Sequence, residues 1–534
     1  MVVKRIRYRR AAAAVAAGAL PCLAFPAPAL WWFAYVALVP WMLLLRSAPT
    51  GRRAALEGWL GGAGFIVGVH HWLLPSLHVF LLPLAALVGL LWIPWALLVR
   101  EFLGGVPDPG RATAALFLVP AGWLLSELAR SWQGLGGPWG LLGASQWQVP
   151  PALRLASVGG VWLVSLLLVA VNCGLVLLIA VPAARVPAVA GVTGCVVLTG
   201  AVWLWLPRPE ASGALRVAVV QPGLVADGPD STEQRFAAGE RLTRALAGQR
   251  VDLVVWGESS VGGDLAARPD LAGRLAALSA EVGAPLLVNV DARRPAGPVP
   301  AAPGPALAAA LPEGGIYKSS VLVGPHGPTG DRYDKMRLVP FGEYIPARSL
   351  LGWATSVGKA AGEDRRHGAE PVLMNLPGRP GVRIGPLVCF ESAFPDMSRR
   401  LTRDGAALLI AQSATSSFQR SWAPAQHASL AALRAAEDGR PMVHATLTGI
   451  SAVYGPSGER IGPALPTSAR TARVYEVPLA RGSTYYVRFG DWPVGACLAL
   501  LAAYCAAEGA RSVGLRKPAP APEPTTPPAR TARG

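Results

Sequence analysis

Long apolar runs dominate the first 206 positions of the chain, and one more follows near its end. A membrane-spanning helix needs about 20 predominantly apolar residues. The pattern predicts spans at about 11–25, 30–45, 56–74, 79–99, 113–128, 155–181, 188–206 and 493–508. Because the first two are short and interrupted by Pro21 and Pro26, we expect them to form a helical hairpin.

The pattern changes between residues 210 and 490, where short β-rich runs alternate in part with amphipathic helical stretches. Strands are predicted at Leu215–Gln221, Val251–Trp256, Pro285–Val290, Tyr317–Val323, Val382–Val388 and Ala406–Ala411. Helices are predicted at about 231–248, 265–281 and 425–438. The chain is therefore divided into a transmembrane domain (1–206), an α/β domain (210–490), a last transmembrane helix (493–508) and a disordered, Pro- and Ala-rich tail (511–534).

The composition agrees with a membrane protein that carries a soluble part. The chain is 52% hydrophobic and only 15% charged, and its mean hydropathy is +0.38. Soluble domains carry about 25% charged residues, so a wholly soluble protein is excluded. The net charge is +17, but much of it flanks apolar runs instead of forming one basic face, and we predict no nucleic-acid partner.

The basic residues also predict the orientation. Lys and Arg gather before the first span and in every second loop, and the other loops are nearly free of them. Such residues are retained on the cytoplasmic side. The N-terminus and the tail are therefore expected in the cytoplasm, and seven crossings place the 210–490 domain on the extracytoplasmic face.

Three polar segments stand out in the α/β domain. Glu258 follows an apolar strand, Lys335 lies in Tyr333–Pro346, and Cys389 follows another strand in Gly385–Ser392. A thiol reacts as the thiolate, a carboxylate can take its proton, and a lysine can stabilise an oxyanion together with a backbone N–H such as that of Phe390. The three would support acyl transfer through a thioester. Of the six cysteines, Cys389 alone lies in polar sequence, and we predict no disulfide framework, no metal site and no cofactor.

These segments resemble a known family. Glu258, Lys335 and Cys389, in that order, are similar to the Glu-Lys-Cys triad of the nitrilase, or carbon–nitrogen hydrolase, superfamily. The resemblance is closer to its membrane-embedded branch, the apolipoprotein N-acyltransferases. It rests on Leu338–Pro346, Arg434–Pro441, Glu127-x-x-Arg130, Gly137-Pro138-Trp139 and Gly143–Gln146. It implies an α-β-β-α sandwich beside about eight membrane spans.

The resemblance also implies a reaction and a role for each matching residue. Cys389 would attack an acyl ester of a membrane phospholipid, Glu258 would be the general base, and Lys335 would stabilise the oxyanion. The acyl chain would then pass to the α-amino group of the diacylglyceryl-cysteine of an apolipoprotein in the bacterial plasma membrane. Glu343, Phe390 and Glu391 would support the site. We expect substrate contacts from Trp256, Lys318, Trp139, Glu127 and Arg130.

The sequence departs from the family pattern at three places. Lys318 stands where the family commonly has Asn, and Phe390 where it often has Tyr. The stretch Ala411–Phe418 stands where the family has Asn-Asp followed by an aromatic-Gly segment. Two alternatives therefore stay open. A membrane-tethered amidase would share the triad and use water as acceptor, and a degenerate paralogue would act as a membrane scaffold without catalysis.

Overall fold

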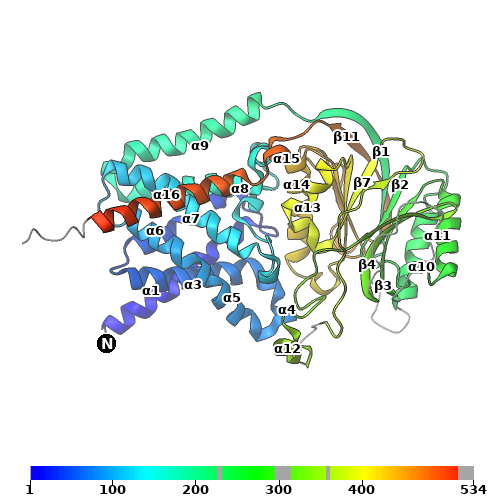
Figure 1. Cartoon of the computed structure of the whole chain (residues 1–534), viewed down its shortest axis with the longest axis horizontal. Helices are drawn as coiled ribbons and strands as arrows, with labels where there is room; N and C mark the ends of the chain where they lie inside the picture. The colour runs from blue at the N-terminus through cyan, green and yellow to red at the C-terminus, as the bar shows by residue number, and fades with distance from the viewer. Residues whose placement is uncertain (1, 225–230, 295–313, 357–360, 515–534) are drawn as a thin grey trace, which may run out of the picture.

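The computed structural model describes residues 2–224, 231–294, 314–356 and 361–514. Figure 1 shows two parts side by side: a bundle of helices that contains the N-terminus, and a part built around two sheets. The chain passes from the bundle to the sheets after α9 and returns through α15 to α16. The tail predicted at 511–534 lies outside the described residues from position 515 on, and α16 extends to Gly514.

The bundle is formed by helices that follow the apolar runs. They are α1 (Val2–Ala19), α2 (Val39–Arg46), α3 (Gly51–His70), α4 (Leu74–Leu77), α5 (Leu81–Gly89), α6 (Ile93–Leu103), α7 (Pro109–Arg130), α8 (Pro150–Ala180), α9 (Arg185–Trp205) and α16 (Trp492–Gly514). Among the described residues, five stretches are long and apolar enough to cross a bilayer. One of them, Gly51–Leu103, contains two of the predicted spans, so the count of eight spans is not confirmed.

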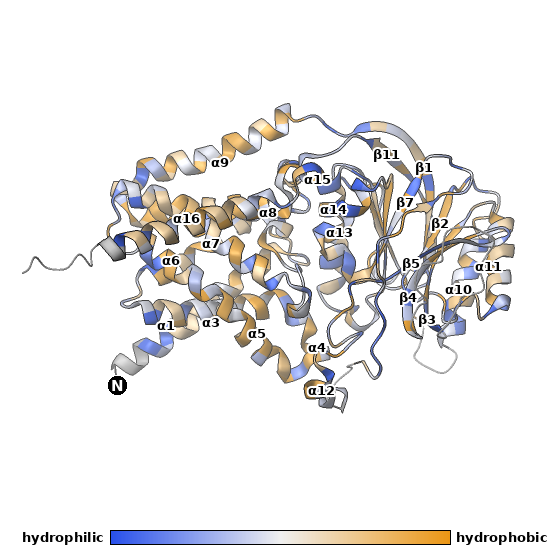
Figure 2. Cartoon of the chain, in the orientation of Figure 1, coloured by the Kyte–Doolittle hydropathy of each residue, from blue (hydrophilic) through white to orange (hydrophobic). Residues whose placement is uncertain are grey.

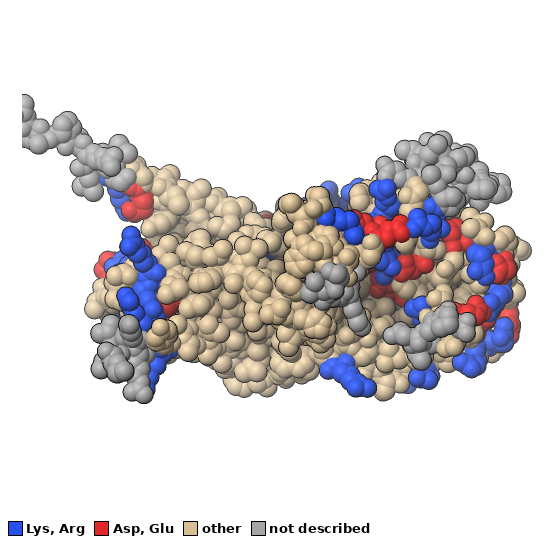
Figure 3. All heavy atoms as spheres, turned by 90° about the horizontal axis from the view of Figure 1, so that it is seen from below, with Lys and Arg blue, Asp and Glu red and all other residues tan. Residues whose placement is uncertain are grey.

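The surface of the bundle fits a lipid environment. Figure 2 shows mostly apolar residues along α5, α7 and α16, whereas α10 and α11 carry many polar ones. In Figure 3 a broad band of the visible face lacks Lys, Arg, Asp and Glu, and charged residues gather at the two ends of the molecule. The far end of the bundle holds hydrogen-bonded arginines, among them Arg10, Arg46, Arg53 and Arg100. Arginines at one end of an apolar band are typical of the cytoplasmic boundary.

The second part contains two sheets that pack face to face. In the described chain, the first sheet has the strand order β11-β1-β2-β3-β4-β5 and the second the order β10-β9-β8-β7-β6. The strands are β1 (Glu210–Gln221), β2 (Leu253–Trp256), β3 (Leu286–Arg294), β4 (Gly315–Gly324), β5 (Gly327–Asp334), β6 (Met374–Asn375), β7 (Arg383–Val388), β8 (Leu408–Ser413), β9 (Met442–Thr446), β10 (Ala452–Tyr454) and β11 (Thr471–Arg481). Parallel pairs β1–β2, β2–β3, β7–β8 and β8–β9 form the centres of the two sheets.

Helices cover both outer faces of this sandwich: α10 (Ser231–Arg244) and α11 (Pro269–Val282) on one, and α13 (Pro395–Arg403) and α14 (Ala423–Asp438) on the other. Two short helices lie outside these layers, α12 (Arg348–Leu351) near α4 and α15 (Tyr485–Phe489) against α8, α13 and α14. One buried cluster lies between the sheets and another lies beneath α10 and α11. The arrangement is therefore the α-β-β-α sandwich that the sequence predicts.

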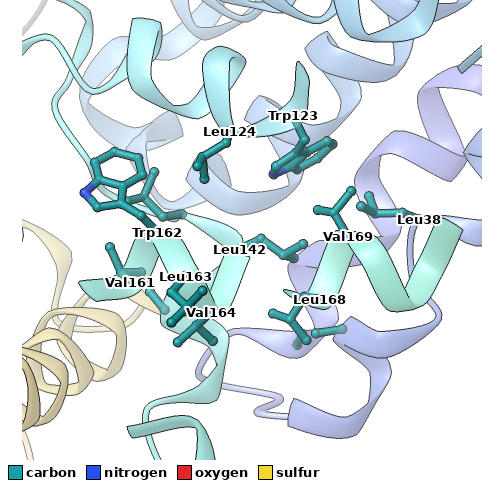
Figure 4. Packing of buried hydrophobic residues seen from close by; sticks show 14 of the residues in the cluster. Leu38, Trp123, Leu124, Leu142, Val161, Trp162, Leu163, Val164, Leu168 and Val169 are labelled. Atoms are coloured by element: carbon teal, nitrogen blue, oxygen red, sulfur yellow. The ribbon is translucent and has the colours of Figure 1, made fainter. Parts of the chain in front are cut away.

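The fourth layer of the sandwich is continuous with the membrane bundle. Helix α14 is buried along almost its whole length and contacts α8, so one apolar cluster extends from α13 and α14 into the bundle. Figure 4 shows part of that cluster, with Leu142 amid Trp123 and Leu124 of α7 and several apolar residues of α8. The two parts thus share a core, which fixes the sheets against the bundle.

A polar contact strengthens this junction. Helix α8 is interrupted at Gly159 and Gly160, where Gly160 has φ of 67°, and the helix restarts at Val161. The Val161 N–H donates to Glu437 Oε1 of α14 at 2.7 Å. Arg434 pairs with the same carboxylate, with Nε 2.7 Å from Oε2, and both side chains are fully buried. A carboxylate at the start of a helix satisfies a free N–H and stabilises the helix.

We expect Glu437→Ala to destabilise the folded protein strongly. The change leaves Arg434 buried without its partner and Val161 without its cap, and breaking a buried pair costs about 3–5 kcal/mol. Thermal unfolding of the purified protein in detergent would measure the fall in Tm. The double variant Arg434→Met/Glu437→Leu is the control, since it removes both members of the buried pair and should recover part of the loss. A single variant as stable as the parent would contradict the pairing.

Candidate active site

The three predicted catalytic residues lie at the ends of strands from both sheets. Glu258 follows β2, Lys335 follows β5 and Cys389 follows β7. Glu258 and Lys335 are 2% and 1% exposed. The Glu258 N–H donates to the Ser413 carbonyl at the end of β8, so the contact joins the two sheets at the site. The fold thus brings together residues that are 131 positions apart, from 258 to 389.

Two lysines converge on the Glu258 carboxylate. Lys318 Nζ of β4 lies 2.8 Å from Glu258 Oε1, and Lys335 Nζ lies 3.3 Å from the same oxygen. Among the described residues, no donor contacts the second oxygen, Oε2. Burial favours the protonated carboxyl, but the two ammonium groups outweigh it and hold the pKa of Glu258 below its usual range. The carboxylate is therefore ionised at neutral pH, with one oxygen available to accept a proton.

Glu343 completes a buried cluster of two carboxylates and two ammonium groups. Its Oε1 lies 2.9 Å from Lys335 Nζ and 3.3 Å from Lys318 Nζ, and its Oε2 accepts from the Val339 N–H at 2.8 Å. Burial opposes charge on the lysines, yet the carboxylates of Glu258 and Glu343 raise the pKa of both. Both lysines stay cationic, which suits Lys335 to stabilising an oxyanion.

Cys389 is presented at a sharp turn between β7 and a short 3₁₀ helix, Cys389–Ala393. Its φ is 52°, a left-handed value that is rare for a residue other than glycine and typical of functional positions. Burial and the Glu258 carboxylate raise the pKa of the thiol to about 12, against the opposing effect of the two lysines. The thiol is therefore protonated at neutral pH and needs a base to become a nucleophile.

The carboxylate of Glu391 joins the Cys389 turn to the segment that carries Lys335. Its Oε2 accepts from the Val388 N–H at 2.7 Å, and its Oε1 accepts from the Met336 and Arg337 N–H groups at 2.7 and 3.0 Å. The Tyr333 hydroxyl also donates to Oε1, at 2.7 Å. Glu391 is fully buried and thus positions both sides of the site. The sequence showed a carboxylate near Cys389 but not this connection, because the partners are distant in sequence.

A second set of contacts leads from Cys389 to the membrane part. His427 Nε2 lies 3.0 Å from the Cys389 carbonyl and 3.0 Å from Ser392 Oγ. Burial lowers the pKa of His427 to about 4, so the ring is neutral and acts as a structural hydrogen bonder. The ring of Trp139 lies 5.2 Å from it, and Trp139 Nε1 donates to Gln426 at 2.8 Å. Trp139 therefore contacts His427, and His427 in turn contacts the Cys389 turn.

Glu127 and Arg130 hold the loop that carries Trp139. Glu127 Oε1 accepts from the Leu142 N–H at 2.6 Å, and Arg130 Nη1 donates to the Trp139 carbonyl at 2.8 Å. Both are buried, and no ion pair joins them in the described chain. They are placed to position the loop, and the structure does not bring them to Cys389. Phe390 lies closer to the cysteine, because it is the next residue in the chain. Its ring packs edge-on against that of Phe394, with the ring centroids 4.9 Å apart, and both rings approach the Gly137 backbone.

The structure does not bring Trp256 into the site. Its Nε1 donates to Thr243 of α10 at 2.9 Å, and its ring packs edge-on against Phe236. A strand alternates its side chains between faces, and Trp256 points to the outer face of the first sheet. Gln412, one of the departures from the family pattern, instead crosses between the sheets and donates to the Trp256 and Leu287 carbonyls at 2.8 and 3.2 Å.

Lys318 is expected to set the acid limb of the pH profile. Its ammonium lowers the pKa of Glu258, so Lys318→Asn should raise that pKa. Because the base must be ionised, activity is lost as pH falls through its pKa, and the variant should lose activity at a higher pH. The profile of kcat/KM against pH measures this. Lys318→Arg keeps the charge and is the control, and an unshifted limb in Lys318→Asn would refute the expectation.

The two-sheet sandwich with Glu, Lys and Cys at its strand ends defines the carbon–nitrogen hydrolase class. The carbon–nitrogen hydrolase family model matches residues 216–486, and the apolipoprotein N-acyltransferase N-terminal domain model matches residues 17–174. An amidase structure from Nesterenkonia sp. aligns with 51% of this chain and 92% of its own, with 19% identity and a TM-score of 0.33.

Relatives match nearly the whole chain. An apolipoprotein N-acyltransferase from Geobacter metallireducens is 31% identical over 91% of this chain and 92% of its own length. One from Azotobacter vinelandii is 32% identical over 91% and 93%. The chain therefore belongs to the apolipoprotein N-acyltransferase family. It is a membrane protein and an acyltransferase on a carbon–nitrogen hydrolase fold.

Proposed function

We propose that this chain moves an acyl chain from a membrane phospholipid to the α-amino group of the diacylglyceryl-cysteine that begins an apolipoprotein. Its family acts in lipoprotein N-acylation. The observation that carries the proposal is the buried cluster of Glu258, Lys335 and Glu343 beside the strained Cys389 turn, joined by His427 and Trp139 to the membrane bundle. Cys389 then acts as nucleophile, Glu258 as general base and Lys335 as oxyanion stabiliser.

The first half-reaction forms a thioester. Glu258 takes the thiol proton, and the Cys389 sulfur bonds to the ester carbonyl carbon of the phospholipid. Lys335 balances the negative charge that develops on the carbonyl oxygen. The carbon–oxygen ester bond then breaks, and the departing lysophospholipid alkoxide takes the proton back from Glu258.

The second half-reaction uses the same groups in the reverse direction. The amine nitrogen of the apolipoprotein attacks the thioester carbon and gives a proton to Glu258. The carbon–sulfur bond breaks, an amide is formed, and the proton returns to the Cys389 sulfur. No net proton is released to the protein, which suits a site in which Glu258 and Lys335 are both 2% exposed or less.

We infer the placement from the basic residues and the apolar helices. The 1–206 domain and the 493–508 helix anchor the chain in the bacterial plasma membrane, with the N-terminus in the cytoplasm. The 210–490 domain then lies on the extracytoplasmic face, next to the outer leaflet that holds both lipid substrates. This placement explains why one apolar core joins α14 to α8, since the site must lie at the membrane surface.

Mass spectrometry of a lipoprotein's N-terminal peptide tests the proposal. A host without its own N-acyltransferase would be complemented with the full chain, and a third acyl group is expected on the terminal cysteine. Release of ammonia from small amides, without a third acyl group, would favour the tethered amidase. Complementation that survives Cys389→Ala would favour the scaffold. Either result would overturn the proposal.

A further inference from the structure

A cavity lies at the junction of the two parts, away from the cysteine site. Its volume is about 420 Å³, and its walls come from the start of α8, the end of α9 and the turn after β10. None of the residues that line it belongs to the Glu258–Cys389 cluster. A volume of this size falls within the usual range for small-ligand sites.

An incompletely paired arginine is among the residues that line this cavity. Arg154 of α8 is 4% exposed, and its Nη2 donates to the Leu206 and Pro207 carbonyls at 2.7 and 2.9 Å. Its Nε is buried and has no partner among the described residues, and neither has the indole Nε1 of Trp147. Buried donors without partners are costly, and both belong to residues that line this cavity, which favours an acceptor bound there.

Two further arginines border the cavity. Arg208 and Arg460 are exposed and form no ion pair with a described carboxylate. Among the described residues that line the cavity, Glu459 alone carries a carboxylate. Its Oε2 accepts a hydrogen bond from the Ser457 N–H of the same turn at 2.9 Å. Three guanidinium groups against one carboxylate leave an excess of two positive charges, which selects an anion.

The walls have the character of a membrane interface. Trp147, Trp203 and Tyr454 line the cavity, and Trp and Tyr are enriched at the boundary between bilayer and water. Helix α9 exposes Val196, Val197, Leu204 and Trp205, and Figure 1 shows its C-terminal end diverging from the bundle. Acyl chains can therefore lie along α9 while a headgroup reaches the arginines.

We propose that this cavity binds the phosphate of an anionic phospholipid headgroup, as a lipid site separate from the catalytic centre. Guanidinium groups match phosphate oxygens in charge and geometry. Arg154 Nε and Trp147 Nε1 donate to the phosphate, and Arg208 and Arg460 neutralise it at the cavity mouth. The inference rests on the membrane placement of α8 and α9 and is independent of the acyl-transfer chemistry.

Native mass spectrometry of the full-length chain in detergent tests this site, with short-chain phosphatidylglycerol as the probe. Arg208→Gln/Arg460→Gln removes two exposed charges without touching the buried contacts. We expect it to weaken binding at one of two lipid sites about tenfold, the effect of losing a charge-assisted hydrogen bond. Arg473→Gln/Arg481→Gln removes two charges from exposed positions of β11 and should leave binding unchanged.

Two further measurements keep the outcomes distinct. Glycerol phosphate should fail to displace the lipid, and displacement would mean that the cavity takes a soluble phosphate. Arg154→Lys keeps the charge but lacks Nε, and we expect it to bind less lipid than the parent. Equal binding in the parent and in Arg208→Gln/Arg460→Gln would overturn the proposal. Thioester formation, measured on the same samples, reports separately on the proposed function.

Discussion

Replacing Cys389 by alanine is expected to abolish both thioester formation and lipoprotein N-acylation. The variant removes the atom that bonds to the acyl chain, and no other cysteine of the described chain lies beside the Glu258–Lys335 cluster. Loss of a nucleophile lowers the rate on the order of 10⁶-fold. Incubation of the purified protein with radiolabelled phospholipid, followed by denaturing gel electrophoresis, measures the covalent label, which hydroxylamine should release.

Cys505→Ala is the matched control, because it removes an exposed thiol of α16 that contributes nothing to the site. It should keep the full label. A label that persists in Cys389→Ala and disappears in Cys505→Ala would assign the chemistry to the membrane helix and contradict the mechanism. The thermal stability of Cys389→Ala should stay close to that of the parent, since the substitution removes a single sulfur atom and keeps the rest of the residue.

Much of the fold could be predicted from the sequence because its signals are local. The strand predicted at Leu215–Gln221 lies inside β1, and the one predicted at Val382–Val388 begins one residue before β7. The helix predicted at 425–438 coincides with most of α14. Apolar runs and alternation record burial directly. Strands β5, β6, β9, β10 and β11 were missed. The exposed positions of β5 and β11 weaken the pattern, and β6, β9 and β10 are short. The number of spans depends on how helices such as α3 to α6 cross or re-enter the bilayer, which apolar length does not determine.

The site was predictable in part, for a related reason. Glu258 and Cys389 each follow a predicted strand, and strand ends are where open α/β sheets present functional groups. Lys335 follows β5, which was not predicted, so its place in the site rested on the resemblance to the family. Trp256 was expected among the substrate contacts, but it is the last residue of β2 and its side chain lies on the outer face of the first sheet. Glu258 comes two residues later, beyond the strand, where the alternation of the strand no longer fixes the direction of the side chain. The carboxylate of Glu391 could not be linked to Met336 by sequence, since only the packing of the two sheets brings them together.

The charge balance of the site explains why a thiol with a pKa of about 12 can react. A lone carboxylate buried beside it would be protonated, and a lone ammonium would lose its proton. With Lys318, Lys335, Glu258 and Glu343 together, all four stay charged. The extra lysine makes Glu258 a weaker base than it would be beside one lysine alone. The site therefore depends on the proximity of Glu258 to the thiol more than on its basicity.

Glu258→Gln separates the contribution that the position of residue 258 makes to the reaction from the contribution of its basicity. Glutamine keeps the size of the side chain but cannot accept the thiol proton, so thioester formation should slow by about 10²–10⁴ at neutral pH. The Glu258 carboxylate also raises the pKa of Cys389, so its removal lowers that pKa. The residual reaction then proceeds through the thiolate that is already ionised. Its rate should rise about tenfold for each pH unit, until the pKa of the thiol is reached.

Single-turnover measurements of thioester formation across a range of pH would reveal this slope. The parent should instead show a plateau at neutral pH, because its base is already ionised there. Glu233→Gln removes an exposed carboxylate that pairs with Arg274 at the surface of α10, and it should reproduce the parent profile. A slow Glu258→Gln variant with a flat profile would mean that Glu258 acts by holding Lys318 and Lys335 in place. The thiol proton would then leave by another route, and Glu343 would be the next candidate for the base, because it contacts the same two ammonium groups.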